Sequence, residues 1–263
     1  MVRHAVSGEE IAAAQRLRYQ VFYEEGAARA DAMAAATGMD CDPFDAICDH
    51  LIVVDCAGKA LVGTYRLLRQ EVAEAHDGFY SAREFDLEPL IERHRHLSFL
   101  ELGRSCVLRP YRTKAVIELL WQGIWDYVRR HRLDVMVGCA SLEGTDPDDL
   151  ALPLSFLAAQ CGAPEAWRAA ALSARHVEMR RLPACAIDAR AAMKALPPLV
   201  KGYLRLGCHV GEGAVIDRQF NTTDILIVLP VAAINNRYFA RYGAPDAMRA
   251  SGGLTRGRRP ASR

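Results

Sequence analysis

The strongest constraint in this sequence is an unbroken succession of an apolar run, a turn, an amphipathic segment and a second apolar run. Residues 99–108 (Phe-Leu-Glu-Leu-Gly-Arg-Ser-Cys-Val-Leu) predict a strand, and residues 113–131 predict an amphipathic helix with one apolar face. Residues 134–140 predict a buried strand. A strand, a helix and a strand of these lengths indicate a right-handed parallel crossover, so the chain is expected to adopt an α/β fold.

Two ionisable residues interrupt the first of these strands. Glu101 and Arg104 are three positions apart, which places them on opposite faces of a regular strand. A β-bulge around Gly103 would turn both side chains toward one cleft. A buried ion pair between Glu101 and Arg104 with a purely structural role explains the same residues, so both interpretations stay open.

The turn that follows carries Arg109 and Arg112 and leads into the start of the helix. Free backbone N–H groups, the helix dipole and two guanidinium groups at one place favour an anion, and a phosphate is the obvious one. A carboxylate-bearing strand beside such a turn suggests an enzyme that holds a donor of the phosphopantetheine type. Solvated loop charges are the alternative interpretation of the two arginines.

An acidic cluster, Asp40-Cys-Asp-Pro-Phe-Asp45, has Asp49 close behind it. Pro43 keeps the residue before it out of helical geometry, so the sequence predicts a loop here. Closely spaced carboxylates repel one another unless a cation lies among them. That cation is a metal ion, an arginine of the protein or an amine substrate. His50 alone does not complete a metal site, and we expect no metal.

The rest of the chain adds shorter elements to this frame. The predicted strands are 2–6, 51–55, 60–68 and 224–230, of which the second and third form a β-hairpin. The predicted helices are one opened by a capping box at Ser7–Glu10, then 148–160, 196–207 and 232–242. Residues 24–39 are expected to form a mobile helix or lid, and 71–96 are expected to be loop-rich. No linker divides the chain, so we expect one domain over 1–245 and a basic, disordered tail over 246–263.

Composition and charge exclude several classes of function. The net charge of +1 provides no bulk attraction for nucleic acid. The eight cysteines form no C-x-x-C pair, so we expect reduced thiols and no zinc site. No signal peptide and no apolar run long enough for a membrane span is present, and we therefore expect a cytoplasmic protein.

Several motifs taken together resemble those of known acyltransferases. Arg18-Tyr-Gln-Val-Phe22, the acidic cluster, Gly63-Thr-Tyr-Arg66 and Glu101-Leu-Gly-Arg104 are similar to the pattern of acyl-homoserine-lactone synthases. The resemblance is closer to the bacterial L-ornithine Nα-acyltransferases, which also show sequences like Leu199-Val-Lys-Gly-Tyr-Leu-Arg-Leu-Gly207 and Asp217-Arg-Gln-Phe-Asn-Thr-Thr-Asp224. It spans nearly the whole chain, from about Leu17 to Tyr242.

This resemblance implies a fold, a reaction and a donor. The fold is that of the GCN5-related N-acetyltransferases (GNAT), a central mixed β-sheet flanked by helices. The reaction is the first step of ornithine-lipid synthesis, in which a 3-hydroxyacyl chain passes from acyl carrier protein to the α-amine of L-ornithine. No permanently bound cofactor is implied, because the acyl-phosphopantetheine of the carrier protein is the donor. A lipid product also implies peripheral contact with the inner membrane.

The resemblance also implies roles for individual residues. Glu101 corresponds to the general base, with Arg104 beside it. The donor side comprises Val107, Leu108, Arg109, Tyr111, Arg112, Thr113 and Lys114. This segment has no glycine, unlike the pyrophosphate loop of acetyl-CoA enzymes, and therefore fits a carrier-protein donor with a single phosphate. The acceptor side comprises Arg18, Phe22, Asp42, Asp45 and Arg66. From charge, we expect the acidic loop to hold the side-chain amine of ornithine and Arg18 or Arg66 to hold its carboxylate.

Arg109, Arg112, Lys114 and the 129–132 cluster are candidate docking charges for the acidic carrier protein. Two other functions stay open at this point. One is acyl transfer to a different amine, since a fold does not fix the acceptor. The other is a non-catalytic protein that binds acyl carrier protein or lipid, against which Glu101 counts.

Overall fold

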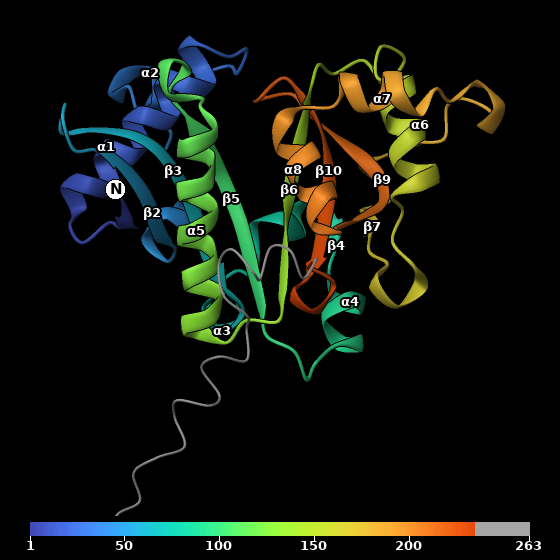
Figure 1. Ribbon diagram of the computed structural model, residues 1–263, viewed down its shortest axis with the longest axis horizontal. Helices are drawn as coiled ribbons and strands as arrows, with labels where there is room; N and C mark the ends of the chain where they lie inside the picture. The colour runs from blue at the N-terminus through green and yellow to red at the C-terminus, as the bar shows by residue number, and fades with distance from the viewer. Residues whose placement is uncertain (235–263) are drawn as a thin grey trace, which may run out of the picture.

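A single ten-stranded sheet runs through the computed structural model, which describes residues 1–234 (Figure 1). The strand order is β1-β2-β3-β5-β6-β10-β9-β7-β4, and β8 pairs with β9 off this path. The strands are β1 Val2–His4, β2 Asp49–Asp55, β3 Ala60–Arg69, β4 Phe85–Asp86, β5 Phe99–Val107, β6 Val135–Glu143, β7 Ala170–Ala171, β8 His176–Val177, β9 His209–Asp217 and β10 Thr222–Pro230. The sheet is mixed, because β5 and β6 run parallel while β2–β3 and β6–β10 are antiparallel.

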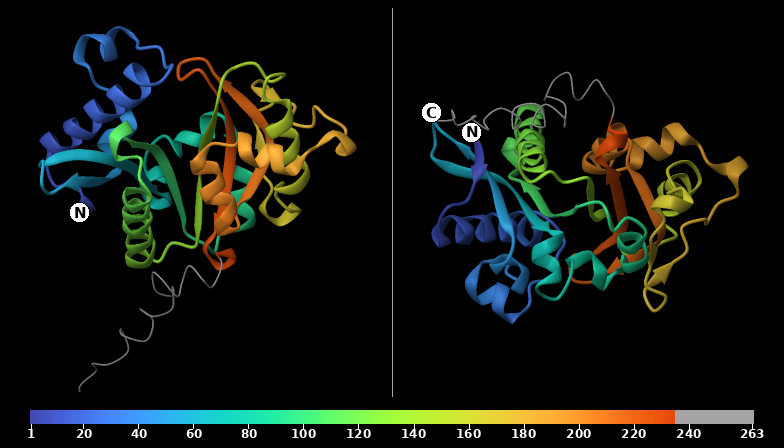
Figure 2. Two further views of the ribbon diagram at one scale, coloured as in Figure 1. Left: turned by 45° about the horizontal axis from the view of Figure 1, so that its top comes forward. Right: turned by 90° about the horizontal axis from the view of Figure 1, so that it is seen from below.

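Helices cover both faces of this sheet. They are α1 Gly8–Tyr19, α2 Ala32–Thr37, α3 Gln70–Glu74, α4 Glu88–Arg93, α5 Lys114–His131, α6 Ala151–Gln160, α7 Ala189–Ala195 and α8 Pro198–Leu206. α5 and α8 lie on one face, and α1 and α4 lie on the other (Figure 2). Ile124 and Trp125 of α5 join Val200 and Tyr203 of α8 in one apolar core. A second core on the opposite face includes Leu90 of α4, so both faces of the central strands are buried.

The central pair of strands separates partway along its length. β5 and β6 pair only where Phe99–Glu101 lies beside Val135–Val137, and they diverge toward the other end (Figure 1). Gly138 follows the last paired residue of β6. A Cβ atom there would lie 2.3 Å from the carbonyl oxygen of Leu102, so only glycine permits this approach of the two backbones.

The predicted β-bulge is present on the other edge of β5. The register between β3 and β5 shifts between Thr64 and Arg66, which gives β5 an extra residue at this point. Arg104 adopts the left-handed conformation with φ of 49°. The bulge therefore falls directly after Gly103, and it changes the direction of the Arg104 side chain.

The structure confirms the predicted crossover of β5, α5 and β6, the β2–β3 hairpin, β10, and a helix α8 that ends at Gly207 in the left-handed conformation. The helix expected over 24–39 is reduced to the short α2, preceded by the π-helical turn Gln20–Glu24. β9 was not predicted, since its glycines weaken the strand pattern. The end of the predicted helix 232–242 and the basic tail lie outside the described residues.

All eight cysteines are free thiols. Within residues 1–234, no helix combines the length and the apolar character that crossing a membrane requires.

Substitution of Gly138 tests the close approach of β5 and β6. We expect Gly138→Ala to lower the free energy of unfolding by about 2 kcal/mol or more, because a backbone oxygen cannot move away from the new methyl group as a side chain can. Gly202→Ala in α8 is the matched control. It meets no atom within 4 Å and should raise stability by about 0.5–1 kcal/mol. Denaturant unfolding measures both, and equal stability of the two variants would contradict the packing argument.

Candidate functional site

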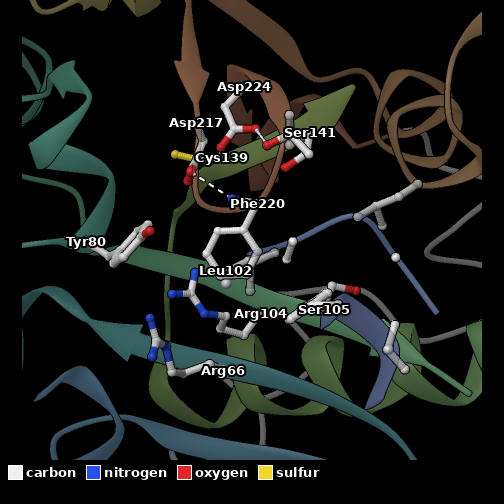
Figure 3. Close-up of a pocket in the computed structure, with 18 of the residues that line it drawn as sticks. Arg66, Tyr80, Leu102, Arg104, Ser105, Cys139, Ser141, Asp217, Phe220 and Asp224 are labelled. Atoms are coloured by element: carbon white, nitrogen blue, oxygen red, sulfur yellow. Dashed lines mark hydrogen bonds between the residues drawn. The ribbon is translucent and has the colours of Figure 1, made fainter. Parts of the chain in front are cut away.

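A cavity of about 740 Å³ occupies the space that the divergence of β5 and β6 opens. Most of its wall comes from five segments far apart in the chain: 21–28, the 80–81 turn, 101–105 of β5, 139–143 of β6 and 217–224 at the β9–β10 turn. Single residues complete it: Cys48, Arg66, Leu68, Arg109, Arg112 and Leu199. Figure 3 shows Arg66 and Arg104 on one side, Asp217 and Asp224 on the other, and Phe220 between them. The cavity thus has a cationic wall and an anionic wall.

Glu101 lies in this cavity at the last position where β5 pairs with β6. Its carboxylate is buried and accepts hydrogen bonds from the backbone N–H groups of Tyr80 at 2.9 Å and Ser81 at 2.6 Å. Burial raises the pKa of Glu101, and these hydrogen bonds limit the rise. The result is a fixed carboxylate that holds a proton more readily than an ordinary glutamate.

The side chain of Arg104 lines the same cavity but forms no ion pair with Glu101 in the part of the chain that the structure describes. The interpretation of these two residues as a structural ion pair is therefore wrong. Its guanidinium lies 4.8 Å from the ring centre of Tyr80 and 4.7 Å from that of Phe220. It also binds Asp40 at 3.2 Å and Asp42 at 3.1 Å. Two aromatic rings and two carboxylates therefore fix its position.

The acidic cluster is neutralised by the arginines of the protein, which settles one of the open alternatives. Arg18 binds Asp40 at 2.9 Å and Asp45 at 2.7 Å, and Arg66 binds Asp42 at 2.6 Å and Asp45 at 3.1 Å. Although burial opposes it, the neighbouring guanidinium groups hold the pKa of Asp45 well below its usual range. We call these three aspartates with Arg18, Arg66 and Arg104 the ion-pair network.

Only part of the predicted acceptor side reaches the cavity. Phe22 and Arg66 line it, whereas Arg18, Asp42 and Asp45 lie behind the wall. Those three have one another, Arg66 and Arg104 as partners, so they support the cavity instead of facing it. An acidic loop already occupied by arginines does not offer a site for an incoming amine.

The predicted donor side is divided in the same way. Arg109 and Arg112 line the cavity, and Arg112 also donates to the carbonyl of Val107 at 2.9 Å and binds Glu25 at 2.6 Å. The hydroxyl of Thr113 caps α5 by accepting from the N–H of Val116. Five predicted residues do not line the cavity: Val107, Leu108, Thr113, the exposed Lys114, and Tyr111, whose hydroxyl binds Asp55.

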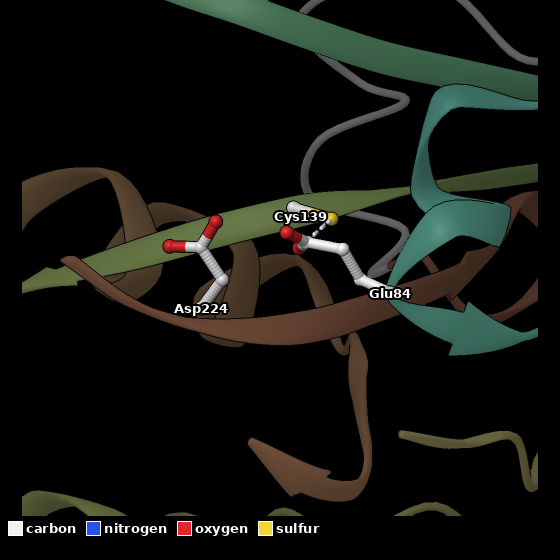
Figure 4. A group of neighbouring side chains, drawn as sticks. All are labelled: Glu84, Cys139 and Asp224. Atoms are coloured by element: carbon white, nitrogen blue, oxygen red, sulfur yellow. Dashed lines mark hydrogen bonds between the residues drawn. The ribbon is translucent and has the colours of Figure 1, made fainter. Parts of the chain in front are cut away.

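The anionic wall was not predicted from the sequence as a site. Glu84, Cys139 and Asp224 present their ligand atoms within 4.8 Å of one another (Figure 4). The thiol of Cys139 donates to Glu84 at 3.3 Å, and Arg175 binds Glu84 at 3.2 Å. Burial and the charge of Asp224 raise the pKa of Glu84 to about 7. One sequence signal could have indicated the anionic wall: Asp224 directly precedes the apolar run of β10.

Comparison with known proteins places the chain among acyltransferases. A family model described as an acetyltransferase (GNAT) domain matches residues 17–122. An L-ornithine N(alpha)-acyltransferase of Agrobacterium fabrum is 51% identical over 95% of this chain and 87% of that protein. One from Rhodobacter capsulatus is 39% identical over 90% of this chain and 92% of that protein. The solved structure of FeeM, an N-acyl amino acid synthase from uncultured soil microbes, superposes with a TM-score of 0.52 at 12% identity, over 91% of this chain and 97% of that one. The predicted GNAT fold is confirmed.

Removal of one carboxylate from the ion-pair network should be costly. Asp45 and Arg18 have side chains only 6% and 1% exposed, so Asp45→Asn leaves a buried guanidinium without its main partner. We expect a loss of about 3–5 kcal/mol in the free energy of unfolding. The control Glu92→Gln removes one side of an exposed pair with Arg95 and should change stability by less than about 0.5 kcal/mol. A loss of similar size in the two variants would show that burial of the network contributes nothing.

The raised pKa of Glu84 predicts a pH dependence of stability. The folded state binds this proton near pH 7 and the unfolded state only near 4.5, so the contribution of Glu84 to stability falls as pH rises from about 5 to 8. The full effect is roughly 3 kcal/mol. Relative to wild type, Glu84→Gln should therefore be more stable at pH 8 than at pH 5.5 in denaturant titrations. The groups that surround this carboxylate are Asp224, Cys139, Arg175 and Asp217. A stability difference between Glu84→Gln and wild type that does not change with pH would contradict the assignment to Glu84.

Proposed function

Because the chain belongs to the L-ornithine Nα-acyltransferase family and is an acyltransferase of the GNAT fold, we propose that it acylates the α-amine of L-ornithine. We further propose that the acyl group is a 3-hydroxyacyl chain delivered by acyl carrier protein, and that the product enters ornithine-lipid synthesis as its first intermediate. The observation that carries this proposal is the buried Glu101 in the cavity between β5 and β6.

The proposed reaction begins with removal of a proton from the α-ammonium of the acceptor. Glu101 takes this proton, directly or through a water molecule, and its raised pKa suits it to the task. The neutral amine then attacks the thioester carbon, a C–N bond forms, and the C–S bond breaks. The nitrogen of the adduct then gives up its second proton and the departing phosphopantetheine thiolate takes one up, so the products are the amide and the free thiol, with the first proton left on Glu101.

The carbonyl oxygen of the thioester carries negative charge during this attack. The backbone of β5 beyond Glu101 has no pairing to β6, and the bulge at Arg104 changes the direction of its N–H groups. We propose that an N–H group in this stretch stabilises the oxyanion, since a fixed backbone donor needs no rearrangement as the charge develops.

Transfer is proposed to be direct, without an acyl-enzyme. Two cysteines line the cavity, Cys48 and Cys139. Burial raises the pKa of Cys48 to about 12, and burial with nearby carboxylates raises the pKa of Cys139 well above the ordinary value, so both thiols are poor nucleophiles. Ser81, Ser105 and Ser141 also line the cavity, but no histidine is found among the described residues of its wall. A serine nucleophile would therefore lack its usual base.

The donor is proposed to approach along Arg109 and Arg112. These two guanidinium groups lie at the turn before α5 and reach the cavity, where they suit the single phosphate of a phosphopantetheine arm. Arg129, Arg130 and Arg132 at the other end of α5 remain candidate docking charges for the carrier protein. Peripheral membrane contact is proposed from the lipid nature of the product.

A transfer assay with purified protein, 3-hydroxyacyl carrier protein and a panel of amino acids tests this function. We expect acylation of ornithine, slower turnover with the corresponding acyl-CoA, and a loss of about 10²-fold or more in Glu101→Gln because the amine then keeps its proton. The control Glu88→Gln, an exposed residue of α4, should retain wild-type turnover.

Turnover with another amine alone would keep the mechanism and overturn the acceptor. Binding of the carrier protein without transfer to any amine would support a non-catalytic binding protein instead.

A further inference from the structure

Two carboxylates of the cavity wall are buried without a cation. The exposed fraction is 6% for Asp224 and 9% for Asp217, and within residues 1–234 neither forms an ion pair. Asp224 accepts hydrogen bonds only from hydroxyls, those of Thr222 at 2.9 Å and of Ser141. Asp217 accepts from backbone N–H groups of its own turn. By contrast, the buried Asp40 and Asp45 are both bound by arginines.

A buried carboxylate without a cation is unfavourable, so its persistence in a cavity wall points to a cationic ligand. We infer that Asp224, assisted by Asp217, binds the distal ammonium of a diamino acid acceptor and thereby selects against acceptors with an uncharged side chain. This assignment rests on the proposed function for the class of acceptor. It moves the recognition of the side-chain amine from the 40–45 loop to the opposite wall.

The arrangement of charges in the cavity matches such an acceptor. Arg66 and Arg104 face the aspartates across the cavity and make that side cationic, and their own carboxylate partners hold them there (Figure 3). Glu101 serves the α-amine, and Asp224 the distal amine. Both carboxylates line the same cavity of about 740 Å³, so one small diamino acid can meet the base and the anionic wall together.

One further observation favours a ligand that carries N–H groups at this wall. The buried Oγ of Ser81 lines the cavity and makes no hydrogen bond of good geometry with a described residue. It is therefore available to accept from an N–H group of the acceptor.

Comparison of ornithine with norvaline tests the inference, because norvaline has the same carbon chain and lacks only the distal amine. In wild type we expect kcat/KM for ornithine to exceed that for norvaline by about 10²-fold, since norvaline leaves the buried carboxylates without a partner. In Asp224→Asn we expect kcat/KM for ornithine to fall about tenfold or more, mainly through KM. The value for norvaline should stay within about twofold. Asp126→Asn, at an exposed position of α5, is the control.

Wild type that acylates both amino acids equally well would overturn the inference without any variant, as would equal losses on both in a folded Asp224→Asn. Asp217→Asn, which keeps the oxygen that accepts from its own turn, provides a second variant with the same expected selectivity if Asp224→Asn does not fold. Loss of activity in chelator and its recovery with added Zn²⁺ would place a metal at this wall instead.

Calorimetry separates this inference from the proposed function. If no amine is acylated, the proposed function fails, yet tighter binding of ornithine than of norvaline that is lost in Asp224→Asn would still support the subsite. Equal binding of the two amino acids would overturn it.

Discussion

The early end of the β5–β6 pairing is the constraint on which the rest of this structure depends. Three pairs of residues hold the strands together, and Gly138 then allows the β6 backbone to touch the carbonyl of Leu102 before the strands diverge. Beyond that point β5 offers unpaired backbone and side chains to a cavity instead of to a neighbouring strand. Glu101 is the last residue of β5 that pairs with β6, so regular structure holds its buried carboxylate at the edge of the cavity. Rigid elements of this kind position a reacting group more accurately than a loop does.

The β-bulge at Arg104 shapes the site. It has an energetic cost, which contacts with the surrounding residues offset. Arg104 in the left-handed conformation costs about 1–2 kcal/mol, because its Cβ approaches the following carbonyl. The rings of Tyr80 and Phe220 and the carboxylates of Asp40 and Asp42 hold the guanidinium in place. Those carboxylates are in turn fixed by Arg18 and Arg66, so the ion-pair network sets the cationic wall of the cavity.

The local hydrophobic pattern of the sequence was sufficient to predict the central strands and helix. It was not sufficient to predict which residues come together at the site. Periodicity predicted β5, α5 and β6, because each buries a regular set of apolar side chains. It also indicated that the acidic cluster needs a cation. It did not identify the arginines as that cation, since Arg18 and Asp45 are 27 residues apart in the chain and meet only through the packing of α1 against the sheet. The anionic wall stayed hidden for a related reason: Glu84 lies in irregular structure and Asp217 ends the unpredicted β9.

The two walls of the cavity differ in how their charges are paired. The paired charges of the cationic wall support the structure, whereas the anionic wall is the side that we infer to recognise the substrate. Every carboxylate of the ion-pair network has an arginine, so the network is complete without a ligand. Within residues 1–234, Asp217 and Asp224 have hydroxyl and N–H partners and form no ion pair, so no arginine offsets the burial of the Asp224 carboxylate. A chain selected for stability alone would replace such residues, because an apolar or amide side chain of similar size avoids the cost. Retention of the unfavourable carboxylates is explained when a cationic group of the substrate completes them during each turnover.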